Sequence, residues 1–241
     1  MANSAVFFDR DGTLIHDPGY LSHPDQVELL DGAAEALKEL QLLGYKTVVV
    51  SNQSGVARGM ITEETLEKIH GRLEELLAQK GASLDRIYYC PYHPDGAIAR
   101  YRKDSDWRKP EPGMLLAAAK EMDLDLAKSW MVGDSSRDIE AGRRAGCATI
   151  LISAAQASRE EAEASPPDHV AVNIREAINI IKKNHRAGRK SREEVLPITE
   201  EEGASVARFP KMSRRKKKTN LNRLRPKRLR HRPNLPRPAR T

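Results

Sequence analysis

The chain has 241 residues, enough for one domain of ordinary size with some chain left over. Its formal net charge of +7 comes from 41 Lys and Arg against 34 Asp and Glu, but the charges are unevenly placed. Residues 204–241 hold 15 of the basic residues and no acidic residue, so the preceding part is acidic on balance. The basic whole-chain charge therefore does not indicate a nucleic-acid-binding fold.

Cysteine content and hydropathy predict the compartment. Cys90 and Cys147 are too few for a disulfide framework, which suits a reducing environment. The first residues lack the basic stretch of a secretory signal, and no apolar run approaches the length of a membrane span. We therefore expect a cytoplasmic protein.

Short apolar runs alternate with longer segments of helical periodicity, a pattern typical of a parallel sheet covered by helices. The segments expected as strands are residues 4–8, 46–50, 86–90, 129–132, 148–152 and the weaker 169–172. The segments expected as helices are one from an N-cap at Asp31 to a stop at Gly44, then 63–80, 113–122, 137–145 and 174–183. A long polar loop is expected at residues 91–112. The pattern predicts one α/β domain over residues 1–185.

Polar clusters follow the expected strands or begin the expected helices. They lie at residues 9–11, 51–55, 108–113 and 133–138. The carboxyl ends of strands in an open parallel sheet are where sites are built, so we expect these clusters to meet. Together they supply carboxylates, a hydroxyl and a cationic pair. This set favours phosphoryl transfer, in which charge on the moving group must be neutralised.

The residue types predict a covalent mechanism. Asp9, at the end of the first strand, can attack phosphorus and form an aspartyl-phosphate. Asp11 can protonate the leaving alcohol and then deprotonate the water that breaks the acyl phosphate. We expect Mg²⁺ to be held by Asp9, by Asp134 and by the backbone carbonyl of Asp11.

Three further residues complete the expected machinery. Ser51 and Lys109 are expected to hydrogen-bond the phosphoryl oxygens. Asp138 lies one helical turn after Asp134, so it suits support of the metal or of Lys109 better than direct catalysis.

Each cluster alone has a plainer interpretation. Two aspartates after an apolar run can form an Asx turn, residues 51–55 a turn, and residues 108–113 a solvated loop. Residues 133–138 can be a helix N-terminus capped by Asp134 or Ser135. The four clusters together, in order and each at a strand end or helix start, favour the functional interpretation.

The clusters "FFDRDGTL", "SNQSG", the Lys of "RKP" and "GDSSRD" resemble the motifs of the haloacid dehalogenase-like hydrolase superfamily. A second aspartate two residues after the first is typical of its phosphatases, so Asp11 favours phosphate-ester hydrolysis. More narrowly, "FFDRDGTLI", "PGY", "SNQSGVARG" and "CPYHP" leading into "RKPEPGM" resemble the histidinol-phosphate and heptose-bisphosphate phosphatase family over about residues 4–185.

The resemblance implies a Rossmann-like three-layer sandwich with a central parallel sheet and no large cap domain. In the heptose members the reaction removes the 7-phosphate of a D-glycero-D-manno-heptose 1,7-bisphosphate, towards the nucleotide-activated heptose of lipopolysaccharide or surface glycans. Arg108 is implied to read the substrate beyond its scissile phosphate. The residues implied to contact substrate are Asp17, Pro18, Gly19, Tyr20, Ser51, Asn52, Gln53, Ser54, Arg108, Lys109 and Ser135.

The sequence departs from the family at the loop before "RKP", which usually carries a structural zinc bound by Cys-x-His and Cys-x-Cys. The four positions hold Cys90, Tyr92, Ser105 and Trp107. One cysteine with His93 out of register cannot complete a tetrahedral site, so we expect no zinc. We expect the loop to be held by packing, through Trp107 and Tyr101.

The C-terminal part has a different composition. Residues 186–213 are expected as a linker, and residues 214–241 as a disordered tail rich in Arg, Lys and Pro. This tail either contacts a polyanion non-specifically or has no specific role. It lacks interleaved aromatic residues, so recognition of specific single strands is not expected.

Other functions remain open at this point. They are a histidinol-phosphate phosphatase, a polynucleotide 3′-phosphatase that uses the basic tail, and a non-enzymatic polyanion-binding protein on a retired fold. The intact set of Asp9, Asp11, Ser51, Lys109 and Asp134 argues against the last. The sequence does not choose between heptose and histidinol phosphate, nor between anomers. A small capless protein without an exposed apolar stripe is expected to be a monomer.

Overall fold

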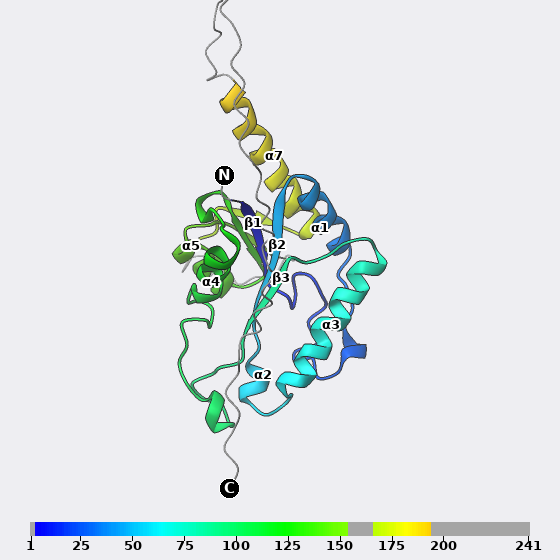
Figure 1. Ribbon diagram of the computed structural model, residues 1–241, viewed down its shortest axis with the longest axis vertical. Helices are drawn as coiled ribbons and strands as arrows, with labels where there is room; N and C mark the ends of the chain where they lie inside the picture. Colours follow the sequence, from blue (N-terminus) through cyan, green and yellow to red (C-terminus); the bar gives the residue numbers. More distant parts are fainter. Residues whose placement is uncertain (1–2, 154–165, 194–241) are drawn as a thin grey trace, which may run out of the picture. The chain divides into compact units, whose positions relative to one another are not determined.

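A six-stranded parallel sheet forms the centre of the computed structural model, which describes residues 3–153 and 166–193 (Figure 1). The strands are β1 (Ser4–Phe8), β2 (Tyr45–Asn52), β3 (Arg86–Cys90), β4 (Trp130–Gly133), β5 (Ala148–Ile152) and β6 (His169–Ala171). Their order in the sheet is β3-β2-β1-β4-β5-β6, and neighbouring strands pair in parallel. The order reverses between β1 and β4, so the carboxyl ends of these strands flank the crevice where such sheets bind ligands.

Helices cover both faces of the sheet. They are α1 (Ala33–Leu42), α2 (Ser54–Ala57), α3 (Glu63–Gln79), α4 (Gly113–Met122), α5 (Ser136–Ala145) and α7 (Ile174–Glu193). Short 3₁₀ turns lie at Pro24–Gln26, Ala99–Tyr101 and Leu126–Lys128. Figure 1 shows α4 and α5 on one side of the sheet and α1, α3 and α7 on the other. The expected three-layer α/β fold is confirmed.

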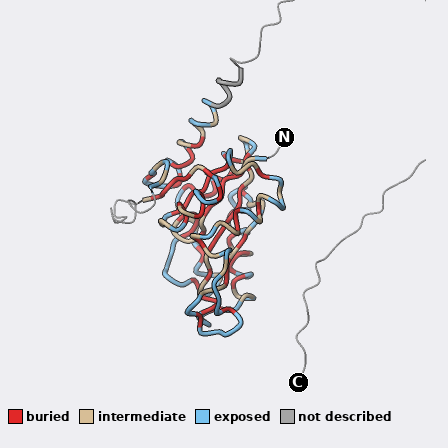
Figure 2. The backbone as a smooth tube through the Cα atoms, turned by 90° about the vertical axis from the view of Figure 1, so that its left-hand side faces the viewer, coloured by how far each residue is buried: buried red, intermediate tan, exposed pale blue. Residues whose placement is uncertain are grey.

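The apolar run of β1 is continuous because both faces of this strand are buried. Side chains alternate across a strand, so Phe8 packs into the cluster with α1, α3 and α7, whereas Phe7 packs into the cluster with α4 and α5. Both rings are fully buried. Figure 2 shows buried residues concentrated in this central region. The strand that ends at Asp9 is therefore held rigidly from two sides.

The structure differs from the sequence expectations at several element ends. The N-cap of α1 is Gly32 rather than Asp31, because the chain turns there with a φ of 87° and the Arg175 side chain lies against the glycine. β2 extends to Asn52, so the cluster at residues 51–55 begins inside the strand. The short α2 follows it, a helix that was not among the predicted elements.

The last helix, α7, is longer than predicted. It continues to Glu193, beyond the expected end at residue 183 and into the segment expected as a linker. His185 contacts Tyr45 of β2, with the ring centroids 5.5 Å apart, and this contact anchors the extension. The predicted tail at residues 214–241 lies outside the described residues.

Within residues 3–153 and 166–193, no helix is long and apolar enough to cross a membrane. No separate cap domain is inserted in this part of the chain. Cys90 and Cys147 are both buried and unpaired.

Candidate active site

A cavity of about 370 Å³ lies where the carboxyl ends of β1, β2 and β4 meet. All four polar clusters singled out in the sequence contribute to its lining. The lining residues predicted from sequence are Asp9, Asp11, Asp17, Gly19, Tyr20, Ser51, Asn52, Gln53, Ser54, Arg108, Lys109, Asp134, Ser135 and Asp138. Pro18, the remaining predicted substrate contact, is exposed outside this lining, whereas both of its neighbours lie within it.

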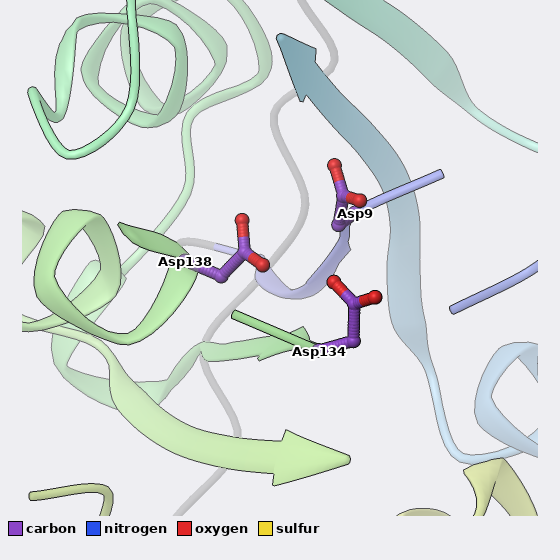
Figure 3. A group of neighbouring side chains, drawn as sticks. All are labelled: Asp9, Asp134 and Asp138. Carbon is purple, nitrogen blue, oxygen red and sulfur yellow. The ribbon is translucent and has the colours of Figure 1, made fainter. Parts of the chain in front are cut away.

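Three carboxylates form the acidic part of the cavity. Asp9, Asp134 and Asp138 each place an oxygen within 4.8 Å of the other two (Figure 3). Asp9 follows β1 and its backbone N–H donates to Val132 O at 3.0 Å, which extends the β1–β4 pairing into the site. Asp134 follows β4, and Asp138 lies in the first turn of α5. The sheet edge therefore brings together residues more than a hundred positions apart.

Lys109 is the cation among these carboxylates. Its Nζ donates to Asp9 Oδ1 at 2.6 Å and to Val50 O at 2.7 Å, and it lies 2.6 Å from Asp138 Oδ1. The side chain is 2% exposed. Burial acts to lower the pKa of Lys109, but the Asp138 and Asp9 carboxylates outweigh it and raise this pKa above its usual range. Lys109 is therefore a permanent positive charge at the cavity floor.

One lysine does not balance three carboxylates. Burial raises the pKa of Asp9 to about 7, with Lys109 acting in the opposite direction. Burial and the charge of Asp138 raise the pKa of Asp134 to about 6. A divalent cation beside Asp9 and Asp134 would relieve both effects, and hard carboxylate and carbonyl oxygens are the ligands that Mg²⁺ prefers. The donor set thus fits the expected magnesium ion.

Asp138 is committed to other partners. Its Oδ2 accepts from the Ser135 backbone N–H at 3.1 Å and from Ser135 Oγ at 2.9 Å, and its Oδ1 faces Lys109. This reciprocal cap begins α5 while it orients the lysine. The supporting role expected for Asp138 stays a prediction, and these contacts are the ones through which Asp138 would act.

The Asp11 carboxylate is held apart from this group. It accepts from Arg10 Nε at 3.0 Å, from Arg10 Nη2 at 2.9 Å and from Gln53 Nε2 at 2.9 Å. Gln53 Nε2 also donates to Ser51 Oγ at 2.8 Å. The Asp11 side chain is therefore turned toward Arg10 and Gln53. The backbone carbonyl of Asp11 is left as the expected metal contact.

Asn52 fixes the loop that carries the lysine. Its Nδ2 donates to the carbonyl of Lys109 at 2.9 Å, and its Oδ1 accepts from the backbone N–H of the same residue at 3.0 Å. The amide group of Asn52 therefore pairs with both backbone polar groups of one residue. The end of β2 thus fixes the backbone position from which the Lys109 side chain extends into the cavity.

Three further arginines lie among the lining residues: Arg58, Arg108 and Arg137. Burial lowers the pKa of Arg108, and the nearby charges of Arg137 and Arg58 act in the same direction. His93 Nε2 lies 3.3 Å from Arg58 Nη2. The cavity lining therefore includes a group of neighbouring arginines in addition to Lys109.

Sequence reasoning found Arg108 but missed Arg10, Arg58, His93 and Arg137. Arg10 is the middle residue of the D-x-D pattern, and its burial could not be read from the sequence. Arg58 follows the "SNQSG" cluster by three positions, and Arg137 lies inside "GDSSRD". Their positions beside motif residues were the available signal.

The loop at residues 91–107 is held by aromatic packing centred on Tyr101, which was expected to contribute. Tyr101 is buried in a cluster with Val56, Ala57, Ile61 and Leu66. Its hydroxyl donates to Glu63 Oε2 at 2.8 Å, and its ring lies 6.1 Å from that of Tyr92. Trp107, the other expected contact, is 36% exposed and meets Tyr88 at 6.1 Å.

Comparison with known proteins agrees with this geometry. A family model described as HAD-hydrolase-like matches residues 106–177, which include Lys109 and Asp134. The D-glycero-beta-D-manno-heptose-1,7-bisphosphate 7-phosphatase of Salmonella typhi is 41% identical over 183 residues, covering 76% of this chain and 97% of the relative. The D-glycero-alpha-D-manno-heptose-1,7-bisphosphate 7-phosphatase of Burkholderia mallei is 42% identical over 152 residues, covering 63% and 80%.

Solved structures show the same similarity. A putative HAD-like phosphatase from Mesorhizobium loti has a TM-score of 0.66 and 34% identity, covering 76% of this chain and 87% of that one. The D,D-heptose 1,7-bisphosphate phosphatase from B. bronchiseptica, complexed with magnesium and phosphate, has a TM-score of 0.64 and 32% identity, covering 75% and 99%.

Gly12 is predicted to be essential for the placement of Asp134. It has a φ of 73°, and a Cβ atom there would lie 2.0 Å from Asp134 Oδ2. Gly44 has a φ of 86° with nothing within 4 Å of its Cβ position, so Gly44→Ala is the matched control for backbone strain. We expect Gly44→Ala to lose about 1–2 kcal/mol of stability and to leave magnesium binding unchanged.

Gly12→Ala should show the same strain and, in addition, bind Mg²⁺ at least about tenfold more weakly, because the Asp134 carboxylate must move. Thermal melting and calorimetric Mg²⁺ titration of both variants measure these effects. Equal magnesium affinity in the two variants would contradict the assignment of Asp134 to the metal.

Proposed function

Because the chain belongs to the heptose bisphosphate phosphatase family of the haloacid dehalogenase-like hydrolases, we propose that it hydrolyses the 7-phosphate of a D-glycero-D-manno-heptose 1,7-bisphosphate. The observation that carries the proposal is Lys109 Nζ, fixed between Asp9 and Asp138 at the floor of a cavity that is also lined by four arginines. Named relatives act on the beta and the alpha anomer, so the proposal covers both. The product would serve the synthesis of nucleotide-activated heptose for surface glycans.

The reaction follows from the positions of the two motif aspartates. Asp9 attacks phosphorus, and the bond from phosphorus to the sugar oxygen breaks as Asp11 gives that oxygen a proton. Asp11 then removes a proton from water, and the water oxygen attacks phosphorus, which releases phosphate and regenerates Asp9. Mg²⁺, held by Asp9, Asp134 and the Asp11 carbonyl, would supply charge neutralisation for the transferred group.

Two other groups stabilise the phosphoryl oxygens. Lys109 supplies a fixed positive charge beside the nucleophile, and its desolvated position strengthens this effect. Ser51 is 1% exposed and lines the cavity, so its hydroxyl lies on a preorganised surface. Preorganised donors of this kind require little rearrangement during the reaction.

The second phosphate of the substrate has its own partners in this proposal. Arg58, Arg108 and Arg137 line the same cavity as the catalytic carboxylates. Guanidinium groups match phosphate geometry, and gathering three of them without an anion is electrostatically unfavourable. A bisphosphate would neutralise this region when the other phosphate reaches Asp9.

The remaining expectations are proposals as well. The buried, unpaired Cys90 and Cys147 support a cytoplasmic location. The small fold without a cap domain in its described part supports a monomer. Non-specific contact of a polyanion with residues 214–241, which lie outside the described residues, is supported by their charge alone.

The proposed activity predicts which substrate has the highest kcat/KM and which substitution abolishes turnover. Phosphate release with Mg²⁺ should be fastest, by kcat/KM, for heptose 1,7-bisphosphate in a panel with histidinol phosphate, fructose 1,6-bisphosphate and a 3′-phosphorylated oligonucleotide.

Asp9→Asn should lose at least about 10³-fold in kcat while it keeps the fold, because the nucleophile is gone and the shape is kept. Asp25→Asn, on an exposed turn away from the cavity, is the matched control. Preference for the oligonucleotide, or an active Asp9→Asn variant, would refute the proposal.

Arg108→Ala should discriminate between substrates with one and two phosphates. We expect kcat/KM to fall about 10- to 100-fold for the bisphosphate, mainly through KM, because a charge-assisted contact is lost. The change for a heptose 7-monophosphate should be small. Arg100→Ala, in the same loop but outside the cavity lining, is the control. An equal loss for both substrates would exclude contact with the second phosphate.

We also propose that the loop at residues 91–107 needs no zinc. The positions Cys90, Tyr92, Ser105 and Trp107 offer one zinc-ligand side chain, and Cys90 Sγ instead lies 3.9 Å from Tyr92 O. Metal analysis should find zinc well below one ion per chain, and a zinc chelator should not change the melting temperature. The positive control is the triple variant Tyr92→His, Ser105→Cys, Trp107→Cys, which supplies four ligands. Stoichiometric zinc in the wild type would contradict the proposal.

A further inference from the structure

A buried arginine lies between the two motif aspartates. Arg10 is 1% exposed, and two of its nitrogens, Nε and Nη2, donate to the Asp11 carboxylate. Its remaining terminal nitrogen, Nη1, lies 3.2 Å from Nε2 of His70. His70 belongs to α3 and is 8% exposed, and it is not among the residues that line the cavity. The guanidinium therefore joins the catalytic site to a helix behind it.

The contact fixes the state of His70. Arginine nitrogens only donate, so His70 Nε2 must accept, and the imidazole is neutral with its proton on Nδ1. Burial and the charge of Arg10 lower the pKa of His70 to about 3, which agrees with this assignment. The ring also packs against Tyr89 of β3, with the centroids 5.5 Å apart. His70 is thus a fixed acceptor.

Asp11 needs such a restraint. Its side chain is 22% exposed at the cavity, and without partners its carboxylate could rotate about two torsions. The paired N–H bonds of Arg10 fix the plane of this carboxylate, and Gln53 Nε2 holds one oxygen from the side of Ser51. An error of about 1 Å in the position of a reacting group can cost about 10²-fold in rate.

We propose that Arg10 and His70 are positioning residues that orient Asp11 for proton transfer to the leaving oxygen. This inference rests on the proposed phosphatase reaction. A stabilising role explains the arrangement less well, because a buried ion pair contributes little more to stability than a packed apolar residue of similar volume. Arg10 acts through Asp11, and His70 acts through Arg10.

The test compares leaving groups. A sugar alcohol needs a proton as it leaves, whereas p-nitrophenolate leaves without one, so kcat/KM for the two esters separates proton donation from other effects. We expect His70→Leu, which removes the acceptor, to lower kcat/KM about tenfold or more for the heptose bisphosphate. The loss for p-nitrophenyl phosphate should stay under about threefold, since general acid catalysis contributes little there.

Two variants complete the design. His70→Gln places an amide oxygen where Nε2 accepts, so it should restore most of the lost activity. Ile69→Val, at a buried neighbour on the same helix, should lower the melting temperature without changing the ratio between the esters. If the wild type hydrolyses the heptose bisphosphate but not p-nitrophenyl phosphate, the ratio between the esters cannot be measured. In that case, the positioning role is supported if His70→Gln recovers the kcat that His70→Leu loses while KM stays unchanged.

The outcomes are separable. Hydrolysis of neither ester by the wild type with Mg²⁺ would overturn the proposed function and the inference with it. An active wild type in which His70→Leu lowers both esters equally, or in which His70→Gln rescues nothing, would overturn the inference alone. A selective loss for the sugar ester with rescue by glutamine would support it.

Discussion

The site depends on one buried ammonium group. Lys109 Nζ contacts Asp9 after β1, the carbonyl of Val50 in β2 and Asp138 in α5, so it joins three elements at one point. A lysine in this position without its carboxylates would be strongly disfavoured, and carboxylates this close together without it would repel one another. The interaction therefore determines both the shape of the cavity floor and its charge. Asn52 holds the backbone of Lys109, and the cap at Ser135 holds the Asp138 carboxylate.

Charge compensation divides the site into two halves. Asp9, Asp134 and Asp138 share Lys109 and retain an excess of negative charge that suits a divalent cation. Asp11 has its own cation in Arg10, so its carboxylate does not compete for Lys109. A nucleophile and an acid/base two residues apart can therefore have different partners and different tasks. Both aspartates lie beyond the end of β1, and it is the contacts of Arg10 and Gln53 that hold the Asp11 carboxylate apart from the group around Lys109.

The sequence predicted the parallel sheet, most helices and the motif residues because these depend on local patterns. The alternation of apolar runs with helical periodicity identified the elements, and strand ends identified the polar clusters that meet at the cavity. Residues such as His70 could not be found in this way. A histidine inside the amphipathic helix α3 is indistinguishable in sequence from an ordinary core residue, and its importance arises from a contact across 60 positions. Element ends such as Gly32 involve tertiary neighbours as well, since a Cβ there would lie 2.5 Å from the Arg175 side chain.

The cationic lining at Arg58, Arg108 and Arg137 has a consequence for how substrate arrives. The first 203 residues are acidic on balance, so the distant field of this part repels a phosphorylated sugar. Among the described residues, the arginines of the cavity are a local source of attraction, which at physiological salt extends over about 8 Å. Added salt screens both the repulsion from this acidic part and the local attraction of the arginines, so its effect on the association rate reports the balance between the two.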